Sequence, residues 1–535
     1  MTHGMIVAPQ PEAVEAGAIT LRDGGNAVDA AIACALVQTA VDPMMCGIAG
    51  FGSMHLYLPG KGLHGLIDFH TKAPAAVTVD MWEDLIEGEC RDGFGFILKG
   101  RPNEMGYQSI MIPGSIKAYH EAVTEYGTMD WKDVVQPAIE YAREGFTVRP
   151  HVDEFWSAAN VMGRVSTAEK LKACAATKRI YTNGGGEFHG VGERIANPDM
   201  VRSLERVRDG GADAFYSGEL ADDIVADMEA NGALLSREDL AGYRTQRPDP
   251  IWGEYRGHRV AGNPPPGGGV MVIEMLHILE NFDLAAMGHN SPDYIATVAE
   301  AMKYATIDKD TRVGDPDFFD VPMDELLSKD YAAGLADRIK SGEQAHVERL
   351  GEPEESKDTT HLCVADEAGN VVTMTHSLGM PSGVITEGLG FMYNGCMGAF
   401  DPRPGRAASI APGKGRFTAM APTIVFKGDE PYVVIGAPGG TFITMGVLQG
   451  ILNVLDFGMT MAEAVAAPRF TANSDTIDVS NRIPRFVTNE LEDRGYPIQR
   501  SPFSYVFAGV HGIEIDDGTW TGGADPGRDG MALRV

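Results

Sequence analysis

The residue types with the most specific chemistry in this sequence are the threonine pair and histidine at residues 359–361. A polar, charged run, residues 351–358, ends directly before them at Asp358. The apolar runs at 362–365 and 371–375 then predict a β-hairpin. A flexible linker that leads into a strand headed by a hydroxyl residue suits a chain that cuts itself and uses the new N-terminal threonine as a nucleophile.

The hydroxyl of Thr359 needs a base, because a threonine side chain is a weak nucleophile at neutral pH. A free α-amine on the same residue can serve, since its ordinary pKa is near about 8. That amine exists only after cleavage between Asp358 and Thr359, and the same hydroxyl can make the cut by attacking the Asp358 carbonyl. Without further context, however, a Thr-Thr-His triplet also fits the start of an ordinary strand.

A glycine pair, Gly439 and Gly440, is the second candidate for chemistry. It lies in residues 436–441 (Gly-Ala-Pro-Gly-Gly-Thr), which end an expected strand and open an expected helix. Backbone N–H groups of two glycines can approach a reacting carbonyl and form an oxyanion hole. The same residues also fit a turn that packs a strand on a helix, or an anion site at a helix N-terminus.

The sequence gives little support for other catalytic motifs, a metal site, disulfides or nucleic-acid binding. The sequence has no GxSxG, Walker A or HExxH motif, and His64 and His70 have no third metal ligand nearby. The six cysteines form no CxxC pair and are expected to be reduced and mostly buried. A net charge of −31 disfavours binding to nucleic acid.

The length of 535 residues, with 44% apolar residues, allows a sizeable core and predicts two to four domains. The first residues lack the basic and apolar regions of a signal peptide. No apolar run reaches the ~18 residues of a membrane span. We therefore expect a cytoplasmic enzyme without membrane partners.

The elements that must position these residues change in character at Thr359. Before it, residues 13–41 predict two helices broken at residues 24–26, and 220–228 and 270–279 predict an amphipathic and a buried helix. After it, strand patterns dominate. The expected strands are 54–58, 259–261, 362–365, 371–375, 423–426 and 432–435, with helices at 442–455 and 461–467. Strands flanked by helices predict sheets stacked between helical layers.

The chain resembles the γ-glutamyltransferase family of N-terminal-nucleophile (Ntn) hydrolases over nearly its whole length. The resemblance rests on many short motifs, of which the most specific are residues 23–31 (DGGNAVDAA), 263–266 (NPPP), 359–361 (TTH), 438–440 (PGG) and 467–470 (APRF). Further matching motifs are 113–114, 135–138, 213–216, 280–283, 314–317, 421–423 and 524–526.

This resemblance implies a proenzyme cut into residues 1–358, the large subunit, and 359–535, the small subunit. The two pieces would share an α+β fold, an αββα sandwich, and form a heterodimer that could itself dimerise. Thr359 would be the nucleophile, Ser377 a second hydroxyl that hydrogen-bonds it, and Gly439 and Gly440 the oxyanion hole. No cofactor would be needed.

The residues that hold γ-glutamate in the family are altered here. His70 stands where the family has an arginine, and Thr418 is followed by Ala419 where the family has two serines. Ala399 replaces an aspartate that pairs with the α-ammonium, and Gly379 replaces an asparagine. A buried ammonium without its carboxylate is unfavourable by roughly several kcal/mol, so we do not expect γ-glutamyl amino acids as substrates.

The sequence therefore predicts an autoprocessed amide hydrolase for a small or acyl-type amide, similar to oxamate amidohydrolases or cephalosporin acylases. His70, Lys72, Arg416 and Thr418 are the candidate substrate-binding residues, with the first three suited to a substrate carboxylate. Two alternatives stay open. One is a γ-glutamyl hydrolase or transpeptidase with a remodelled pocket, and the other is an uncleaved, non-catalytic binding protein.

Overall fold

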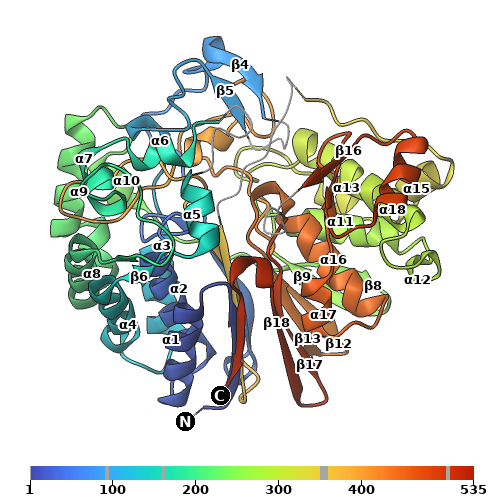
Figure 1. The fold of residues 1–535 in the computed structure, drawn as a ribbon, viewed down its shortest axis with the longest axis horizontal. Coiled ribbons are helices and arrows are strands. Elements are labelled where there is room, and N and C mark those ends of the chain that lie inside the picture. Colours follow the sequence, from blue (N-terminus) through green and yellow to red (C-terminus); the bar gives the residue numbers. More distant parts are fainter. Residues whose placement is uncertain (1, 91–94, 158–163, 350–358, 502–506) are drawn as a thin grey trace.

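Two six-stranded antiparallel sheets lie face to face between two helical layers (Figure 1). The computed structural model describes residues 2–90, 95–157, 164–349, 359–501 and 507–535. Asp358 and the expected linker of residues 352–358 lie outside the described residues. The predicted αββα sandwich is confirmed.

The first sheet has the strand order β19-β1-β10-β11-β2-β3. Its strands are β19 (Met531–Arg534), β1 (Gly4–Ala8), β10 (Thr360–Asp366), β11 (Val371–Ser377), β2 (Phe51–Leu58) and β3 (Leu63–Phe69). The hairpin β10–β11 therefore lies at the centre of the sheet, with strands from the N-terminal part of the chain on both sides.

The second sheet has the order β18-β17-β13-β12-β9-β8. Its strands are β18 (Thr519–Ala524), β17 (His511–Asp516), β13 (Glu430–Gly436), β12 (Thr423–Lys427), β9 (His258–Gly262) and β8 (Ile251–Tyr255). The other strands of the described residues form three small sheets. Two of these have two strands each, β4 (Ile86–Glu89) with β5 (Phe96–Leu98) and β6 (Phe146–Thr147) with β7 (Arg194–Ile195). The third contains β14 (Phe470–Thr471), β15 (Ile477–Ser480) and β16 (Ile498–Ser501).

Helices of the N-terminal half cover the first sheet (Figure 1). They are α1 (Pro11–Arg22), α2 (Ala27–Val41), α3 (Ser115–Tyr126), α4 (Trp131–Glu144), α5 (Pro150–Ser157), α6 (Thr167–Leu171), α7 (Ala175–Tyr181), α8 (Pro198–Tyr216), α9 (Glu219–Ala230) and α10 (Arg237–Gly242). The predicted break between α1 and α2 has a clear cause: Gly24 has φ +103°, and Asn26 caps α2 in a capping box with Asp29. All residues of α2 are buried.

The other helical layer packs on the second sheet. It contains α11 (Gly269–Leu279), α12 (Leu284–Met287), α13 (Pro292–Arg312), α14 (Met323–Leu326), α15 (Lys329–Lys340), α16 (Ile443–Leu455), α17 (Met461–Ala466) and α18 (Arg485–Asp493). The helix expected from residue 442 begins at Ile443, after a short 3₁₀ turn at Gly440–Phe442.

The apolar core is divided in three, and the division shows which way each strand residue points. Leu362 and Val364 of β10 join the core under the N-terminal helices. Cys363 and Ala365 join a separate core between the two sheets. Side chains of a strand alternate between faces, so odd-numbered residues of β10 face the second sheet and even-numbered ones face α2.

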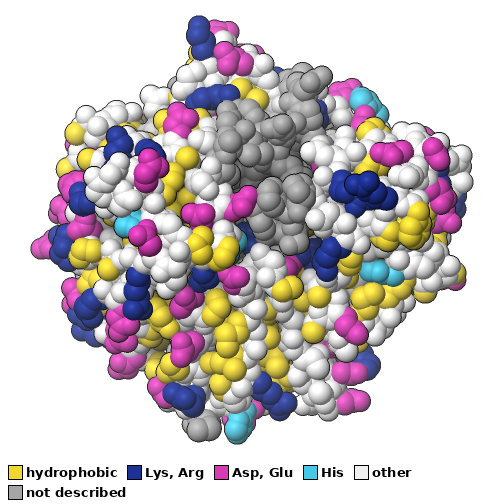
Figure 2. Space-filling view, viewed as in Figure 1, with side chains coloured by type: hydrophobic (Ala, Val, Ile, Leu, Met, Phe, Trp, Pro, Cys, Tyr) yellow, Lys and Arg dark blue, Asp and Glu magenta, His cyan; other side chains and the backbone are white. Residues whose placement is uncertain are grey.

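The distribution of surface charge and the state of the cysteines agree with the expectations from the sequence. Acidic and basic side chains are interspersed on the face shown in Figure 2, with no gathering of one sign. None of the six cysteines forms a disulfide; five are buried and Cys174 is half-buried. Among the described residues, no helix is both long and apolar enough to cross a membrane.

Candidate active site

Thr359 lies at the N-terminal end of β10, buried, with its hydroxyl Oγ1 3.3 Å from Ser377 Oγ. The pairing of β10 with β11 explains this contact. Thr360 pairs with His376, and one step further along the same register puts Thr359 opposite Ser377. The structure thus brings together the two hydroxyl groups that the sequence singled out.

Ser377 is itself held by the backbone. The N–H of Gly379 donates to Ser377 Oγ at 2.7 Å, and Ser377 pairs across the ladder with Phe51 of β2. Its hydroxyl is therefore oriented from one side by an amide and can interact with Thr359 on the other.

The glycine pair is brought to the same edge of the sandwich by the packing of the two sheets. His361, two residues after Thr359, lies against the end of β13, where a Cβ on Gly436 would come within 2.1 Å of the imidazole ring. Residues two apart on a strand share a face, so Thr359 also faces the second sheet. Gly439 follows Gly436 by three residues.

The backbone at this pair requires glycine. Gly439 has φ +143° and Gly440 φ +58°, and a Cβ on Gly439 would lie 2.7 Å from Ala508 Cα. Within the described part of the chain, neither Gly439 nor Gly440 donates its N–H to another residue. Two amide donors at the start of a helix segment fit the predicted oxyanion hole.

The histidines near Thr359 are unsuited to act as its base. Burial, with the nearby histidines His511 and His376, holds the pKa of His361 well below its ordinary value, and burial lowers that of His376 to about 3. Their ring nitrogens are also engaged. His361 contacts Thr375 Oγ1 at 2.8 Å and Cys363 Sγ at 3.2 Å, and the partners of His376 are Tyr119 and Gln38.

Phe51 is the ladder partner of Ser377, and four residues surround its ring. We call these five residues the Phe51 cluster: Phe51, His70, Gly379, Cys396 and Arg416. The ring of Phe51 lies 6.0 Å from that of His70 and 4.7 Å from the guanidinium carbon of Arg416. A Cβ on Gly379 would meet Cys396 Sγ at 2.6 Å and Arg416 Nη2 at 2.8 Å. Two of the predicted substrate-binding residues, His70 and Arg416, thus lie around the ring of Phe51, the ladder partner of Ser377.

His70 has one nitrogen fixed and one open. Its Nδ1 contacts Asp68 Oδ1, which also accepts the His70 backbone N–H at 2.9 Å. Its buried Nε2 has no hydrogen-bond partner among the described residues. Asp68 sets the orientation of the ring, as a carboxylate does for many functional histidines, and leaves Nε2 available to a ligand.

The other two predicted substrate-binding residues are engaged elsewhere. Lys72 Nζ pairs with buried Asp315 at 3.1 Å, and Asp315 also accepts the Gly415 N–H at 2.7 Å. Thr418 donates its backbone N–H to Pro266 O at 2.8 Å. Both residues support the segment that carries Arg416, and no described contact joins them to Thr359.

Phe51, Asp68 and Cys396 were not foreseen as parts of the site. For Asp68 the i, i+2 spacing to His70 at a strand end was a usable signal. Phe51 and Cys396 gave none, because only the fold brings them together. The thiol of Cys396 donates to Leu378 O at 3.3 Å, and burial raises its pKa, so it serves here as a small packing group.

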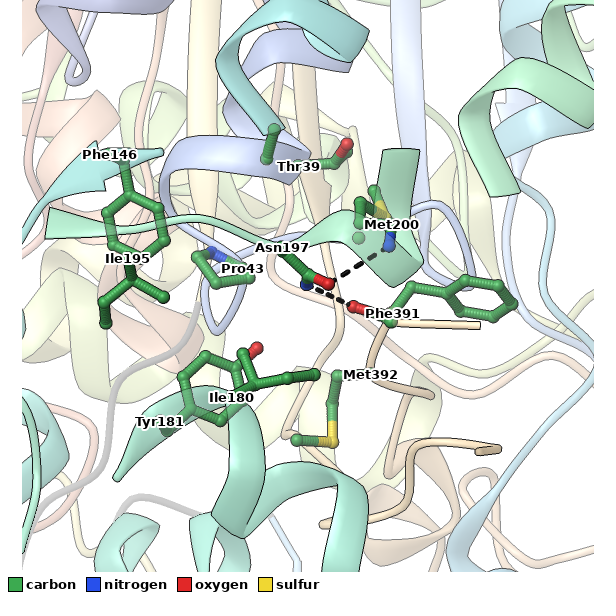
Figure 3. A pocket seen from close by; sticks show the side chains of 13 residues that line it. Thr39, Pro43, Phe146, Ile180, Tyr181, Ile195, Asn197, Met200, Phe391 and Met392 are labelled. Carbon is green, nitrogen blue, oxygen red and sulfur yellow. Dashed lines mark hydrogen bonds between the residues drawn. The ribbon is translucent and has the colours of Figure 1, made fainter. Parts of the chain in front are cut away.

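A cavity in another part of the molecule is too small to be the active site. It lies beside the end of α2 and is lined by residues such as Thr39, Phe146, Tyr181, Asn197 and Met392 (Figure 3). Its volume of about 10 Å³ is room for about one water. Within the described ranges, no three His, Cys, Asp or Glu side chains gather into a possible metal site.

Known proteins resemble this chain in sequence and in fold. Residues 13–535 match the family described as Gamma-glutamyltranspeptidase. The chain is 38% identical to an Acylase ACY 1 proenzyme of Pseudomonas sp. (strain V22), over 100% of this chain and 94% of that protein. It is 35% identical to a glutathione hydrolase proenzyme of Pseudomonas sp. (strain A14), over 88% and 81% respectively. The crystal structure of cephalosporin acylase from Bacillus halodurans superposes with a TM-score of 0.87 at 29% identity, covering 99% of this chain and 96% of the other.

Proposed function

The chain belongs to the gamma-glutamyltranspeptidase family, and we propose that it is an acylase-type amide hydrolase that cuts itself before Thr359 and then uses Thr359 as nucleophile. The observation that carries the proposal is the buried contact of 3.3 Å between Thr359 Oγ1 and Ser377 Oγ. His361, two residues after Thr359, lies against Gly436, three residues before Gly439. The names of the acylase and glutathione hydrolase relatives, both proenzymes, support a cut in the chain.

Self-cleavage would need no outside reagent except water. Thr359 Oγ1 attacks the carbonyl carbon of residue 358, the C–N bond breaks, and the acyl group passes to the threonine oxygen. The nitrogen takes the hydroxyl proton and becomes the α-amine of Thr359. Water then hydrolyses the ester, which leaves a carboxylate on Asp358 and a free hydroxyl on Thr359.

Turnover repeats the same attack on a substrate amide. The α-amine of Thr359 accepts the hydroxyl proton, since His361 and His376 are buried, neutral and engaged. The N–H groups of Gly439 and Gly440 stabilise the oxyanion, and Ser377 orients the attacking oxygen. The proton passes to the leaving amine, and water releases the acyl group as a carboxylic acid.

The Phe51 cluster favours an acyl group that ends in a carboxylate and has no α-ammonium. The guanidinium of Arg416, whose Nη1 donates to Phe417 O at 2.9 Å, supplies a positive charge for a carboxylate. His70 offers Nε2 next to the same Phe51 ring. Among the described residues, the nearby carboxylates are already engaged. Asp68 contacts His70, Asp315 binds Lys72, and Asp401 binds Arg403 at 2.7 and 2.8 Å. An ammonium group would therefore be poorly compensated here.

The cleavage step is tested by mass spectrometry of the purified protein after incubation. We expect a fragment that begins at Thr359 in the wild type, none in Thr359→Ala, and slower formation in Thr359→Ser, which keeps the hydroxyl. A wild-type chain that stays full-length would instead support the uncleaved binding protein.

The acyl preference is tested with a matched pair of anilides, glutaryl and γ-glutamyl p-nitroanilide, which differ only in the α-ammonium group. We expect kcat/KM for the glutaryl compound to be higher by about tenfold or more, the effect of one poorly compensated charge. A preference for the γ-glutamyl compound would favour the γ-glutamyl hydrolase or transpeptidase instead.

A further inference from the structure

A continuous hydrogen-bonded network of buried side chains lies on the opposite face of the β10–β11 ladder from Thr359. Its members are Gln10, Gln38, Asp42, Tyr119, Thr360 and His376, all at most 2% exposed. None of them faces the substrate side, because Thr360 and His376 are even-numbered residues of their strands and point toward α2. The activity proposed above makes no use of them.

Gln38 of α2 joins the two strands of the hairpin. Its Nε2 donates to Thr360 Oγ1 at 3.0 Å, and its Oε1 accepts from His376 Nε2 at 2.7 Å. Thr360 and His376 are direct cross-strand partners. One carboxamide therefore connects Thr360 with His376, the ladder pair directly next to the Thr359–Ser377 pair.

The direction of every hydrogen bond follows from Asp42, which can only accept. Gln10 Nε2 donates to Asp42 Oδ2 at 2.7 Å, so Gln10 Oε1 is left to accept from Gln38 Nε2 at 2.7 Å. Gln38 Oε1 must then accept from His376 Nε2, which leaves His376 Nδ1 to accept from Tyr119 O–H at 2.7 Å. The chain of donors is complete and allows one arrangement.

Asp42 anchors this arrangement as an anion. Burial alone would raise its pKa, but His151, whose Nε2 lies 3.9 Å from Asp42 Oδ2, and the charge of Arg149 hold the pKa below its ordinary value. His376 at the other end stays neutral, since burial lowers its pKa. Every group of the network thus has a hydrogen-bond partner. A buried polar network that is fully paired in this way is rigid.

We propose that Gln38 and Thr360 are positioning residues that set the spacing of the Thr359 and Ser377 hydroxyls. Thr360 is covalently next to the proposed nucleophile, and His376 is next to Ser377. A rigid bridge between Thr360 and His376 fixes the two strands at the point where the reacting groups leave them. A misplacement of about 1 Å at a reacting group can slow a reaction by about 100-fold.

The inference rests on the proposed function and is tested with Gln38→Met and with the isosteric change Thr360→Val, against Thr360→Ser, which keeps the hydroxyl. We expect Gln38→Met and Thr360→Val to slow self-cleavage and to lower kcat by about tenfold to 100-fold, with little change in KM. Thr360→Ser should stay close to the wild type.

The matched control is Gln449→Met. Gln449 is also a buried glutamine whose carboxamide joins two elements, since it donates to Phe470 O at 2.8 Å and accepts the Phe470 N–H at 3.2 Å. It lies in α16, away from the ladder. We expect a similar loss of Tm with kcat unchanged, which separates positioning from general stability.

The outcomes are distinct. If Thr360→Val keeps the wild-type kcat, or if Gln449→Met loses as much kcat as Gln38→Met, the positioning role is refuted. If Gln38→Met does not fold, the Thr360→Val and Thr360→Ser pair decides alone. A wild type that neither cleaves nor hydrolyses amides overturns the proposed function itself, which mass spectrometry of the wild type reveals before any variant is made.

Discussion

At the scale of single residues, the candidate site combines the hydroxyl pair of Thr359 and Ser377 with buried histidines that stay neutral. His361, His376 and His511 are buried close to Thr359 or to the strands that carry it, and burial is the first cause that lowers each of their pKa values. A buried neutral ring takes up a proton only at a large desolvation cost, and both ring nitrogens of His361 and His376 are also hydrogen-bonded. In the proposed mechanism the amine of Thr359 is the base, and cleavage of the chain is the step that would create it.

The pH dependence of turnover follows from this. The pKa of His376 is about 3 and that of His511 is about 3, so neither ring changes charge between about pH 5 and 8. The α-amine, with an ordinary pKa near about 8, must be deprotonated to act. We expect kcat of the processed enzyme to rise with pH through one ionisation near about pH 7–8, measured as a pH–rate profile. An activity that instead falls across that range would contradict the amine as base.

Gly379 offers a residue-scale test of the Phe51 cluster. A side chain there is strained because φ is +73°, and its Cβ would press on Arg416 Nη2. We expect Gly379→Ala to lose about 1–3 kcal/mol of stability and to raise KM severalfold by displacing Arg416. Gly388→Ala is the control, since φ there is +80° but no atom lies within 4 Å of the added carbon. Equal KM values in the two variants would exclude Arg416 from substrate binding.

At the scale of elements, some were predictable from sequence because local signals agree with the fold. The pair α1 and α2, the fully buried α11, and the strands of the β10–β11 hairpin were all expected, and each has its own apolar pattern or glycine break. Thr359 and the glycine pair were singled out because their local order, linker to strand and strand to helix, is visible in the sequence, and their catalytic roles stay predictions. Ser377 was placed by family resemblance.

Other elements carry no local signal. The strand β18 includes Gly522 and Gly523 and looks like a turn in sequence, yet a Cβ on Gly522 would meet Met5 Sδ at 2.9 Å. The glycine is required by close packing against the first sheet, which only the assembled sandwich creates. The Phe51 cluster is similar, since its five residues come from distant parts of the chain.

The contact of α11 with α13 contains a buried carboxyl whose titration is an element-scale prediction. Burial, followed by the charge of Asp308, raises the pKa of Glu274 well above its ordinary value. The folded state therefore binds this proton more tightly than the unfolded chain does. Stability from this group is complete below the unfolded pKa of about 4.3 and is lost as pH rises toward the folded pKa.

Glu274→Gln removes that loss, because an amide cannot ionise. We expect the variant to gain Tm relative to the wild type at pH 8 and to gain less at pH 5, measured by thermal unfolding at both values. Glu300→Gln is a control for which we expect the opposite effect, since Glu300 is a paired carboxylate. It pairs with Lys303 at 3.1 Å and accepts the Ala345 N–H at 2.6 Å. That variant should lose stability at pH 8. A Glu274→Gln variant less stable than the wild type at pH 8 would show that Glu274 is a charged partner.

At the scale of the whole molecule, the proposed cut would divide each of the two six-stranded sheets between the two fragments. In the first sheet β10 and β11, which follow the cut, lie between β1 and β2, which precede it, and β1 itself lies between β19 and β10. In the second sheet four neighbouring strands, β18, β17, β13 and β12, follow the cut, and β12 pairs with β9 from before it. All three apolar cores contain residues from both sides of the cut.

The fragments should therefore stay together after cleavage and not fold separately. We expect the cleaved protein to keep the mass of the intact chain, 57.3 kDa, or a multiple of it, in native mass spectrometry, while a denaturing gel resolves two bands. High salt should not separate them, because ladder hydrogen bonds and apolar burial hold them rather than screened surface charges. Residues 1–358 and 359–535 produced alone should lack a cooperative unfolding transition, and mixing them during refolding should restore it. Fragments that separate in salt at neutral pH, or that fold independently, would contradict the interleaved assembly.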